Sequence, residues 1–277
     1  MAVDPRRRQL GDFLRTRRTQ LDRAAFGLPP VTRGRGMGLR REEIAYLSGV
    51  SVTWYTWLEQ GRPINPSRQV LDAVARTLRL TAAERAYVLS LAGAATPATG
   101  AAEAAEVPPH VQHLLDALQT SPAFAIAADW SIAAWNRAYQ ALYPGVATVP
   151  AQDRNLLWLV FTDPDVRAML PDWAADSRHF LAEYRAEAAP RLGEAAHADL
   201  VERLGRASEV FRAAWRDHDV EGFTSRERRF HRPEVGDLDF EHHRLELSDV
   251  PGLHLVVYTP VSGTPTAERL ARLLAGS

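Results

Sequence analysis

The sequence contains no cysteine and no lysine, and the missing cysteine removes whole classes of protein. Without thiols the chain cannot form disulfides, a cysteine nucleophile, an iron–sulfur cluster or a thiolate zinc site. It also has no apolar run of about 18 residues or more, so no membrane span is expected. The arginines near the N-terminus are not followed by the apolar stretch of a secretory signal. We therefore expect a cytoplasmic protein.

All 33 basic residues are arginines, and they are unevenly distributed. Residues 1–95 hold 16 arginines and 8 acidic residues, whereas residues 96–277 hold 17 arginines and 26 acidic residues. A basic first third favours a polyanionic partner. The Ala-, Gly-, Thr- and Pro-rich stretch at 93–109 is typical of a connecting segment. We therefore predict two domains, 1–95 and 107–277, joined by a linker at 96–106.

The two predicted domains differ in their secondary-structure patterns. In the first, apolar residues recur at helical spacing, as in Leu10, Phe13 and Leu14, which predicts an all-α domain. In the second, helical patterns over 153–218 precede alternating patterns typical of strands over 223–258. The second domain is therefore predicted to be α+β with a small antiparallel sheet.

Residues 38–62, GLRREEIAYLSGVSVTWYTWLEQGR, fit a helix-turn-helix. This motif needs a small residue where its two helices touch and, four positions later, a turn residue that tolerates positive φ. Ala45 and Gly49 meet these needs. The apolar residues that hold the second helix down are Ile44, Val50, Tyr55 and Leu58. Spacing, charge and helical setting together predict DNA binding.

The stretch GVSVTWYTWLEQGR resembles the recognition-helix segment of the Xre-type, lambda-repressor-like helix-turn-helix family, in its MmyB-like branch. In the broader family an arginine of the first helix pairs with the glutamate that ends the recognition helix. The resemblance thus implies a structural ion pair between Arg18 and Glu59. The docking geometry of such motifs places the N-terminal half of the recognition helix, from about Val52, in the major groove.

Several side chains become candidates for DNA contacts in this arrangement. With Tyr55 and Leu58 inward, the outward residues of the recognition helix are Val52, Thr53, Thr56 and Trp57. Threonine and valine can contact thymine methyl groups, but none of the four reads a base with two hydrogen bonds. The arginine candidates are Arg40, Arg41 and Arg62 for phosphates, and Arg33 and Arg35 for a groove. Trp54 and Trp57 can equally cover the core, and a flanking arginine can be a plain surface charge.

Segments of the second domain resemble the MmyB-like ligand-binding domain, a PAS-like sensor fused to this type of helix-turn-helix. Among them are SPAFAIAADWSIAAWNRAYQALY (121–143), SEVFRAAWRDHDV (208–220) and FHRPEVGDLDFEHHRLEL (230–247). With the first domain, the resemblance covers nearly the whole chain. It implies a bacterial transcription regulator whose sensor holds a small hydrophobic, fatty-acid-like ligand and no other cofactor. The chain departs from the family at His231, which is followed by arginine where proline is usual.

The second domain supplies many aromatic residues that suit an apolar pocket, although each can equally be plain core. The candidates for the pocket wall are Trp135, Phe161, Trp173, Phe180, Tyr184, Phe211 and Trp215. The candidates for polar contacts are Asn136, His218, Arg229 and His231, with Arg229 the first choice to hold a carboxylate. Asn136 can equally cap a helix, and the other three can be ordinary surface groups.

Catalysis is not expected, and neither is a metal site. His242 and His243 are adjacent, so on a strand they face opposite sides and do not share a metal. The chain carries no P-loop, GxGxxG, GxSxG or HExxH motif. We therefore predict a homodimeric regulator that binds a double-stranded operator, because two half-sites normally supply specificity. The alternative is a DNA-binding protein whose second domain only dimerises or docks a protein partner.

Overall fold

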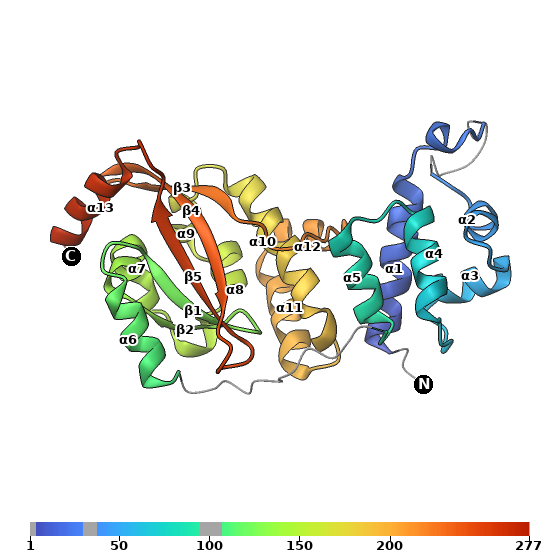
Figure 1. Cartoon of the computed structure of the whole chain (residues 1–277), viewed down its shortest axis with the longest axis horizontal. Helices are drawn as coiled ribbons and strands as arrows, with labels where there is room; N and C mark the ends of the chain where they lie inside the picture. The colour runs from blue at the N-terminus through green and yellow to red at the C-terminus, as the bar shows by residue number, and fades with distance from the viewer. Residues whose placement is uncertain (1–3, 30–37, 95–106, 277) are drawn as a thin grey trace. The chain divides into compact units, whose positions relative to one another are not determined.

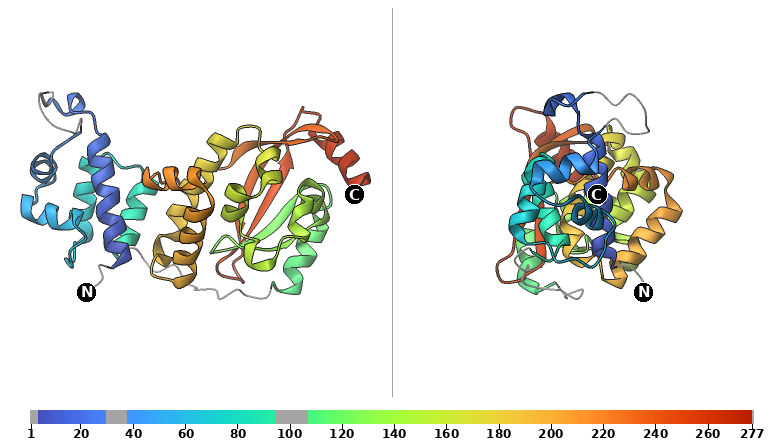
Figure 2. Two further views of the ribbon diagram at one scale, coloured as in Figure 1. Left: turned by 180° about the vertical axis from the view of Figure 1, so that it is seen from behind. Right: turned by 90° about the vertical axis from the view of Figure 1, so that its right-hand side faces the viewer.

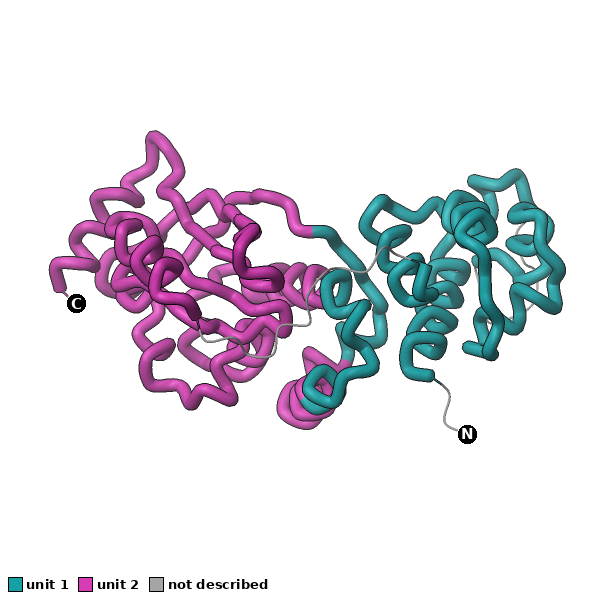
Figure 3. The backbone as a smooth tube through the Cα atoms, turned by 60° about the horizontal axis from the view of Figure 1, so that its bottom comes forward, with its two compact units in different colours: residues 1–97, 185–199, 213–222 teal, residues 98–184, 200–212, 223–277 magenta. Residues whose placement is uncertain are grey.

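The computed structural model describes residues 4–29, 38–94 and 107–276 (Figure 1). The chain forms two compact units, neither of which is continuous in sequence (Figure 3). Unit 1 comprises residues 1–97, 185–199 and 213–222, and unit 2 comprises residues 98–184, 200–212 and 223–277. The predicted linker lies outside the described residues. Two segments that the sequence assigned to the second domain thus belong to unit 1.

Unit 1 is helical. Its first helices are α1 (Pro5–Gln20), η1 (Ala24–Phe26), α2 (Arg41–Ser48), α3 (Val52–Glu59), α4 (Arg68–Thr77) and α5 (Ala82–Leu91). Side chains fix where several of them begin. The Ser67 hydroxyl accepts a hydrogen bond from Val70 N–H at the start of α4, and Thr81 and Glu84 form a reciprocal capping box at the start of α5. Helix α1 packs against α3 and α5, and α2 packs against α3 and α4.

The core of unit 1 joins these helices to the two segments that come from farther along the chain. Its fully buried residues include Phe13, Leu14, Ile44, Tyr55, Leu71 and Val88. Ala189 and Val220 are buried in the same cluster. Gly11 allows the close approach of α1 to α3, because a Cβ there would lie 2.4 Å from the carbonyl oxygen of Glu59.

Unit 2 is a five-stranded antiparallel sheet covered by helices (Figures 1 and 2). The strands β1 (Ala123–Ala127), β2 (Ile132–Trp135), β3 (Arg226–Arg232), β4 (Gly236–Glu246) and β5 (Leu253–Pro260) lie in the order β2-β1-β5-β4-β3. The helices are α6 (Pro109–Ala117), α7 (Arg137–Leu142), η2 (Pro144–Ala147), η3 (Ala151–Asp153), α8 (Leu156–Thr162), α9 (Pro164–Met169) and α13 (Thr266–Ala275). The predicted fold classes, all-α followed by α+β with an antiparallel sheet, are confirmed.

Three helices contribute residues to both units. They are α10 (Trp173–Ala188), α11 (Ala195–Ala207) and α12 (Glu209–Arg216), while η4 (Ala189–Arg191) belongs to unit 1. The residues of helix α10 up to Tyr184 belong to unit 2, and those from Arg185 onward belong to unit 1. It is therefore one continuous element with side chains in both units.

The two faces of the sheet carry different side chains, because successive strand residues point to opposite sides. On one face small and aliphatic residues pack against α6, among them Ala125, Leu255 and Val257. The other face carries a cluster of aromatic rings: Phe124, Phe230, Phe240 and Tyr258. The Phe124 ring lies 4.5 Å from the ring of Tyr139 on α7, so this second face is covered by helices too.

Candidate functional site

Helices α2 and α3 form the helix-turn-helix that the spacing predicts. Ala45 is fully buried, and Gly49 ends α2 with a φ of 69°, the left-handed conformation that glycine adopts without strain. The Ser51 hydroxyl accepts a hydrogen bond of 3.1 Å from Trp54 N–H and so fixes the start of α3. Local signals therefore set both the turn and the beginning of the recognition helix.

The outward face of α3 carries most of the residues that the sequence assigned to it. Val52 is 45% exposed and Trp57 is 39% exposed, Thr53 is exposed, and Thr56 is half-buried. The Arg62 guanidinium lies 5.8 Å from the centre of the Trp57 ring. Trp54, for which two roles were open, is half-buried and packs against the core of unit 1.

A buried ion cluster ties α3 to α1 and α2. Arg18 is 9% exposed, and its Nε donates to Glu59 Oε1 at 2.6 Å while its Nη2 donates to Glu59 Oε2 at 3.1 Å. Its remaining nitrogen, Nη1, donates to the Leu39 carbonyl at 2.7 Å. Burial opposes ionisation of Glu59, but hydrogen bonds from Arg18 and Arg41 outweigh it and lower the pKa of this carboxyl. The pair implied by the family resemblance is therefore present in the structure.

The predicted phosphate-contacting arginines differ in their surroundings. Arg41 donates from Nε to Glu59 Oε2 at 2.6 Å, so it belongs to the ion cluster. Arg40 is exposed at the start of α2, and Arg62 is exposed and donates to the Gln60 side chain at 3.0 Å. Arg33 and Arg35 lie outside the described residues.

Two exposed residues of α2 were missed by the sequence analysis. Tyr46 is 86% exposed and Leu47 is 46% exposed. Tyr46 lies on the side of α2 opposite the inward residues Ile44 and Ala45, whereas Leu47, three residues after Ile44, lies at the edge of the buried face. They leave an apolar surface beside the helix-turn-helix.

Unit 2 contains an apolar cavity between the aromatic face of the sheet and helices α7 to α10. Its wall includes Tyr139, Leu142, Tyr143, Leu156, Leu159, Val160, Val166, Met169, Leu170, Phe180, Phe230 and Tyr258. The space open to a water-sized sphere is about 20 Å³, roughly what one water molecule occupies. In this conformation the side chains therefore fill most of the cavity themselves.

A group of charged and polar side chains adjoins this cavity. Arg228 on β3 is 4% exposed, and its guanidinium lies 3.9 Å from the centre of the Phe180 ring. Its Nε donates to His242 Nδ1 at 3.3 Å. Within the described residues, neither Nη1 nor Nη2 of Arg228 has a hydrogen-bond partner. Its closest carboxylate contact is with Glu183, at 4.0 Å, and Glu183 already accepts a hydrogen bond of 2.6 Å from Arg226.

The pKa values of the groups around Arg228 reflect the burial of this region. Burial lowers the pKa of His242 to about 2, and the nearby charge of Arg228 is the second cause. The ring is therefore neutral, and its Nδ1 can accept a hydrogen bond from Arg228. Burial also raises the pKa of Asp176 and that of Tyr258. The guanidinium of Arg228 is thus a positive charge in a region that disfavours ions.

Three of the predicted wall residues lie together, and a fourth, Phe180, lines the cavity. Phe180 is part of the cavity wall. The rings of Phe161 and Phe211 lie 5.3 Å apart, and those of Phe161 and Trp173 lie 6.2 Å apart. Trp173 donates from its indole nitrogen to the Val160 carbonyl at 2.8 Å. These three rings form a packed cluster behind the wall of the cavity.

The other predicted residues of unit 2 have structural partners. Asn136 accepts a hydrogen bond from Tyr139 N–H and so caps α7, the second of its two anticipated roles. Trp135 donates to Gln140 at 3.3 Å. The Tyr184 ring lies 5.4 Å from that of Trp130.

Two predicted polar residues of β3 lie on its solvent side. Arg229 donates from Nε to Asp239 at 2.6 Å, and His231 lies 2.7 Å from Asp237. Arg229 and His231 are exposed, whereas Arg228 and Phe230 alternate with them and are buried. The buried arginine was missed although Phe230, the one apolar residue of β3, marks the inward side of this strand and Arg228 shares that side two residues away.

Trp215 and His218 belong to unit 1 and do not line the cavity of unit 2. The Trp215 ring lies 4.4 Å from the Arg185 guanidinium. His218 accepts a hydrogen bond of 3.1 Å at its carbonyl from Arg17, and burial lowers the pKa of its ring to about 4. These two residues therefore help to attach the distant segments to the helical core of unit 1.

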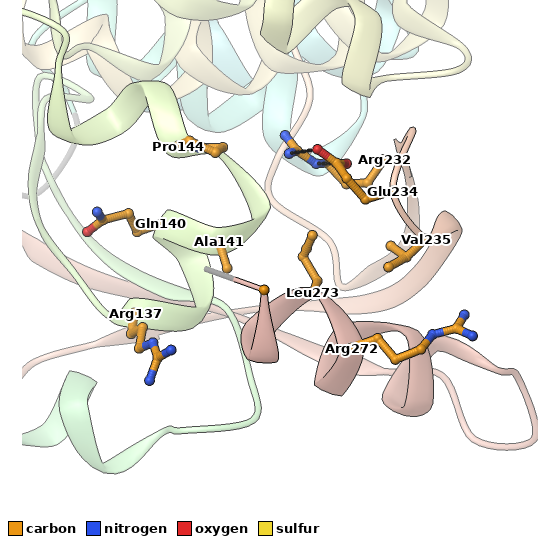
Figure 4. A pocket seen from close by; sticks show the side chains of 10 residues that line it. Arg137, Gln140, Ala141, Pro144, Arg232, Glu234, Val235, Arg272 and Leu273 are labelled. Atoms are coloured by element: carbon orange, nitrogen blue, oxygen red, sulfur yellow. Dashed lines mark hydrogen bonds and ion pairs between the residues drawn. The ribbon is translucent and has the colours of Figure 1, made fainter.

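A second hollow of unit 2 is larger and open to solvent (Figure 4). It has a volume of about 880 Å³ and lies among α7, the turn between β3 and β4, and α13. Arg232 there is paired with Glu234 at 2.9 Å, and Arg137 donates to the Leu274 carbonyl at 3.0 Å. Its walls are polar, charged and small aliphatic side chains, which suit a hydrophobic ligand less well than the enclosed cavity does.

None of the helices in the described parts of the chain combines the length and apolar content that a membrane span requires. In the same residues, no group of three or more histidine and carboxylate side chains is placed to hold a metal ion.

Comparison with known proteins adds two matches. The family described as "MmyB-like transcription regulator ligand binding domain" matches residues 107–274. The family described as "Helix-turn-helix domain" matches residues 9–88. No curated protein matches the chain.

Proposed function

We propose that this chain, which belongs to the family of the MmyB-like transcription regulator ligand binding domain, binds its operator as a dimer under the control of a fatty-acid-like ligand. Its two matched domains make it a DNA-binding transcription regulator. The observation that carries the ligand proposal is the apolar cavity of unit 2. Binding rather than catalysis is the proposed mode of action.

The proposed DNA interface is the N-terminal half of α3. Val52, Thr53 and Trp57 face base edges in the major groove, with Thr56 at the border of this face. Arg40 and Arg62 contact phosphates, because both are exposed beside the two helices. Arg41 contributes indirectly, since its guanidinium holds Glu59.

This interface is tested with a duplex selected for tight binding and with a scrambled duplex. Thr53→Ala and Trp57→Ala should weaken binding of the selected duplex by about 1–3 kcal/mol and leave the scrambled duplex unaffected, because base contacts supply discrimination. Arg62→Ala should weaken both and reduce the salt slope by about one. Arg229→Ala, an exposed arginine of unit 2, is the control and should change neither. If Trp57→Ala unfolds the protein or weakens both duplexes equally, the base-facing role of Trp57 is wrong.

The dimer is proposed because one helix-turn-helix module buries little surface on DNA and two half-sites normally supply specificity. Native mass spectrometry of the full chain, alone and with the selected duplex, reports the number of chains directly. Two chains per duplex support the proposal, and one chain per duplex contradicts it.

The rival of the ligand proposal is that unit 2 is a dimerisation or docking module with a solid core, with which the small open volume of the cavity is also compatible. A titration of the full chain with medium and long fatty acids separates the two. An acyl ligand should change tryptophan fluorescence, raise the melting temperature and alter affinity for the selected duplex, because it binds only the folded state. No response in any of the three measurements supports the rival.

Helix α10 is the proposed route from ligand to DNA. A ligand controls DNA binding only if it binds two arrangements of the protein unequally. Phe180 on α10 lines the cavity, and Arg185 on the same helix is buried in unit 1. Arg185 donates to the Asp219 carbonyl at 2.6 Å and to the Trp215 carbonyl at 2.8 Å. A shift of α10 on ligand binding would therefore reach residues packed in the helical unit.

A further inference from the structure

We infer that Arg228 is the anchor for the head group of the ligand of unit 2, and that the site takes an anionic amphiphile with a carboxylate on an apolar chain. This inference rests on the proposed function, because it assigns the charged end of the ligand proposed there. Arg229, the first choice from sequence, is replaced in this role by its buried neighbour.

Arg228 has unused hydrogen-bonding capacity. A buried guanidinium normally has its nitrogens satisfied by carboxylates or carbonyls, because an unpaired buried charge is costly. As far as the described residues go, Nη1 and Nη2 of Arg228 donate to nothing, although the side chain is 2% exposed. These two nitrogens form the fork that binds a carboxylate with two parallel hydrogen bonds.

The charged groups around Arg228 leave this fork available to a ligand. His242 uses only Nε of Arg228, and its ring is neutral. Glu183 is held by Arg226 at 2.6 Å and approaches Arg228 only to 4.0 Å. Asp176 acts on Arg228 by longer-range attraction, and burial disfavours its charged form. A ligand carboxylate would therefore meet the fork of Arg228, with Glu183 and Asp176 as the opposing carboxylates.

Arg228 lies beside the apolar cavity of unit 2. Phe180, whose ring lies 3.9 Å from the guanidinium, is part of the cavity wall. Phe230, two residues along β3 on the same buried side, also lines the cavity. Tyr258 lines it as well and stacks on His242 with 5.1 Å between ring centres. A head group at Arg228 thus places an attached chain against the apolar wall.

An apolar chain must displace side chains to enter, because the open space is only about 20 Å³. The wall is made of aliphatic and aromatic residues, and it includes Met169, whose unbranched side chain adapts readily. Each methylene buried there should strengthen binding about fourfold. The affinity should therefore depend on both the chain length and the charged head.

The test separates head from tail with three probes of equal chain length: dodecanoate, dodecanol and methyl dodecanoate. Binding to the full-length protein at pH 8 is followed by tryptophan fluorescence and by calorimetry. Dodecanoate should bind the unaltered protein about tenfold or more tightly than either neutral probe, because only the carboxylate pairs with the guanidinium fork. Arg228→Met should remove this difference while leaving dodecanol binding unchanged, and Arg228→Lys should retain part of it. Arg229→Met, the adjacent exposed arginine, should retain all of it.

Each result is decisive. Equal affinity of the unaltered protein for dodecanoate and dodecanol overturns the anchor while leaving the hydrophobic-ligand proposal standing, and this comparison needs no variant. Retention of the tenfold preference by a folded Arg228→Met protein, or its loss in Arg229→Met, also overturns the anchor. Failure of all three probes to bind overturns the ligand proposal itself and the anchor with it.

Discussion

Two buried arginines, Arg18 in unit 1 and Arg228 in unit 2, differ in how many of their guanidinium nitrogens are hydrogen-bonded. In unit 1 every guanidinium nitrogen of Arg18 donates a hydrogen bond of between 2.6 and 3.1 Å, two of them to Glu59. In unit 2 only Nε of Arg228 has a hydrogen-bond acceptor among the described residues, and that acceptor is neutral. Both side chains are almost fully buried.

The contrast separates a structural charge from one with spare binding capacity. Arg18 and Glu59 fix α3 against α1, and a recognition helix needs a fixed orientation to read a groove. Arg228 holds no such partner and gains no comparable stabilisation from the fold. If the two arginines differ in this way, substituting each of them should change the free energy of unfolding by different amounts.

The largest effect is expected from breaking the Arg18–Glu59 pair. Glu59→Gln leaves the buried Arg18 without a carboxylate, which costs about 3–5 kcal/mol of unfolding free energy. Arg18→Met should cost less, because Glu59 keeps its 2.6 Å hydrogen bond from Arg41. Urea unfolding of the full chain, followed by a probe of helix content, measures this loss. An unchanged transition in both variants would mean that the pair adds nothing to the stability of unit 1.

A somewhat smaller effect is expected from acid, through His242 in unit 2. Burial lowers the pKa of His242 to about 2, whereas an unfolded histidine titrates near 6.5. Below pH 6.5 the unfolded chain therefore binds a proton that the folded chain does not, so stability is full above pH 6.5 and falls as the pH decreases. Between pH 6.5 and pH 4 this histidine alone should remove about 3 kcal/mol.

The contribution of His242 is measured with the variant His242→Gln. Between pH 6.5 and pH 4 this variant should lose about 3 kcal/mol less unfolding free energy than the unaltered protein. The variant is compared with the unaltered protein first at pH 8, where both side chains are neutral, so that the lost packing against Tyr258 is accounted for separately. Identical acid sensitivity of the two proteins below pH 6.5 would show that His242 is protonated in the folded state.

A small effect is expected from Arg228→Met in the absence of ligand. The substitution removes a charge that has little pairing to lose, and it places an apolar chain of similar length beside Phe180. Replacing buried charges by apolar side chains is often neutral or stabilising, so we expect a change within about 1 kcal/mol. Thermal unfolding beside Arg18→Met checks the contrast directly. Equal destabilisation by the two variants would remove the distinction between the arginines.

The smallest effect is expected at a more exposed pair of unit 1, where Arg85 Nε lies 2.8 Å from Asp72 and the two side chains are 49% and 18% exposed. Solvent screens such pairs and the side chains lose freedom in forming them, so Asp72→Asn should leave the unfolding midpoint unchanged. This variant is the reference for Glu59→Gln, because it also removes one carboxylate from an arginine. A loss as large as that of Glu59→Gln would show that short distance, not burial, determines the strength of these pairs.

Much of unit 1 could be predicted because its signals are local. The separation of Ala45 from Gly49, the outward spacing of Val52 and Trp57 and the helical periodicity of α1 all depend on residues within a few turns of one another. The α+β pattern of the second unit was readable for the same reason. The hydrogen-bond partner of Arg228 was not, because His242 comes from β4 and its place opposite β3 depends on the pairing of the two strands.

The sequence by itself thus determined the helix-turn-helix, the basic character of the first unit and the strands of the second, since each follows from neighbouring residues. Only the tertiary structure decided that Arg228 meets the neutral His242 and leaves Nη1 and Nη2 without an acceptor among the described residues, since its neighbours come from other elements. It also decided that Arg41 donates a hydrogen bond to Glu59, and that residues 185–199 and 213–222 belong to the helical unit. These outcomes depend on contacts between residues far apart in the chain, which local spacing does not specify.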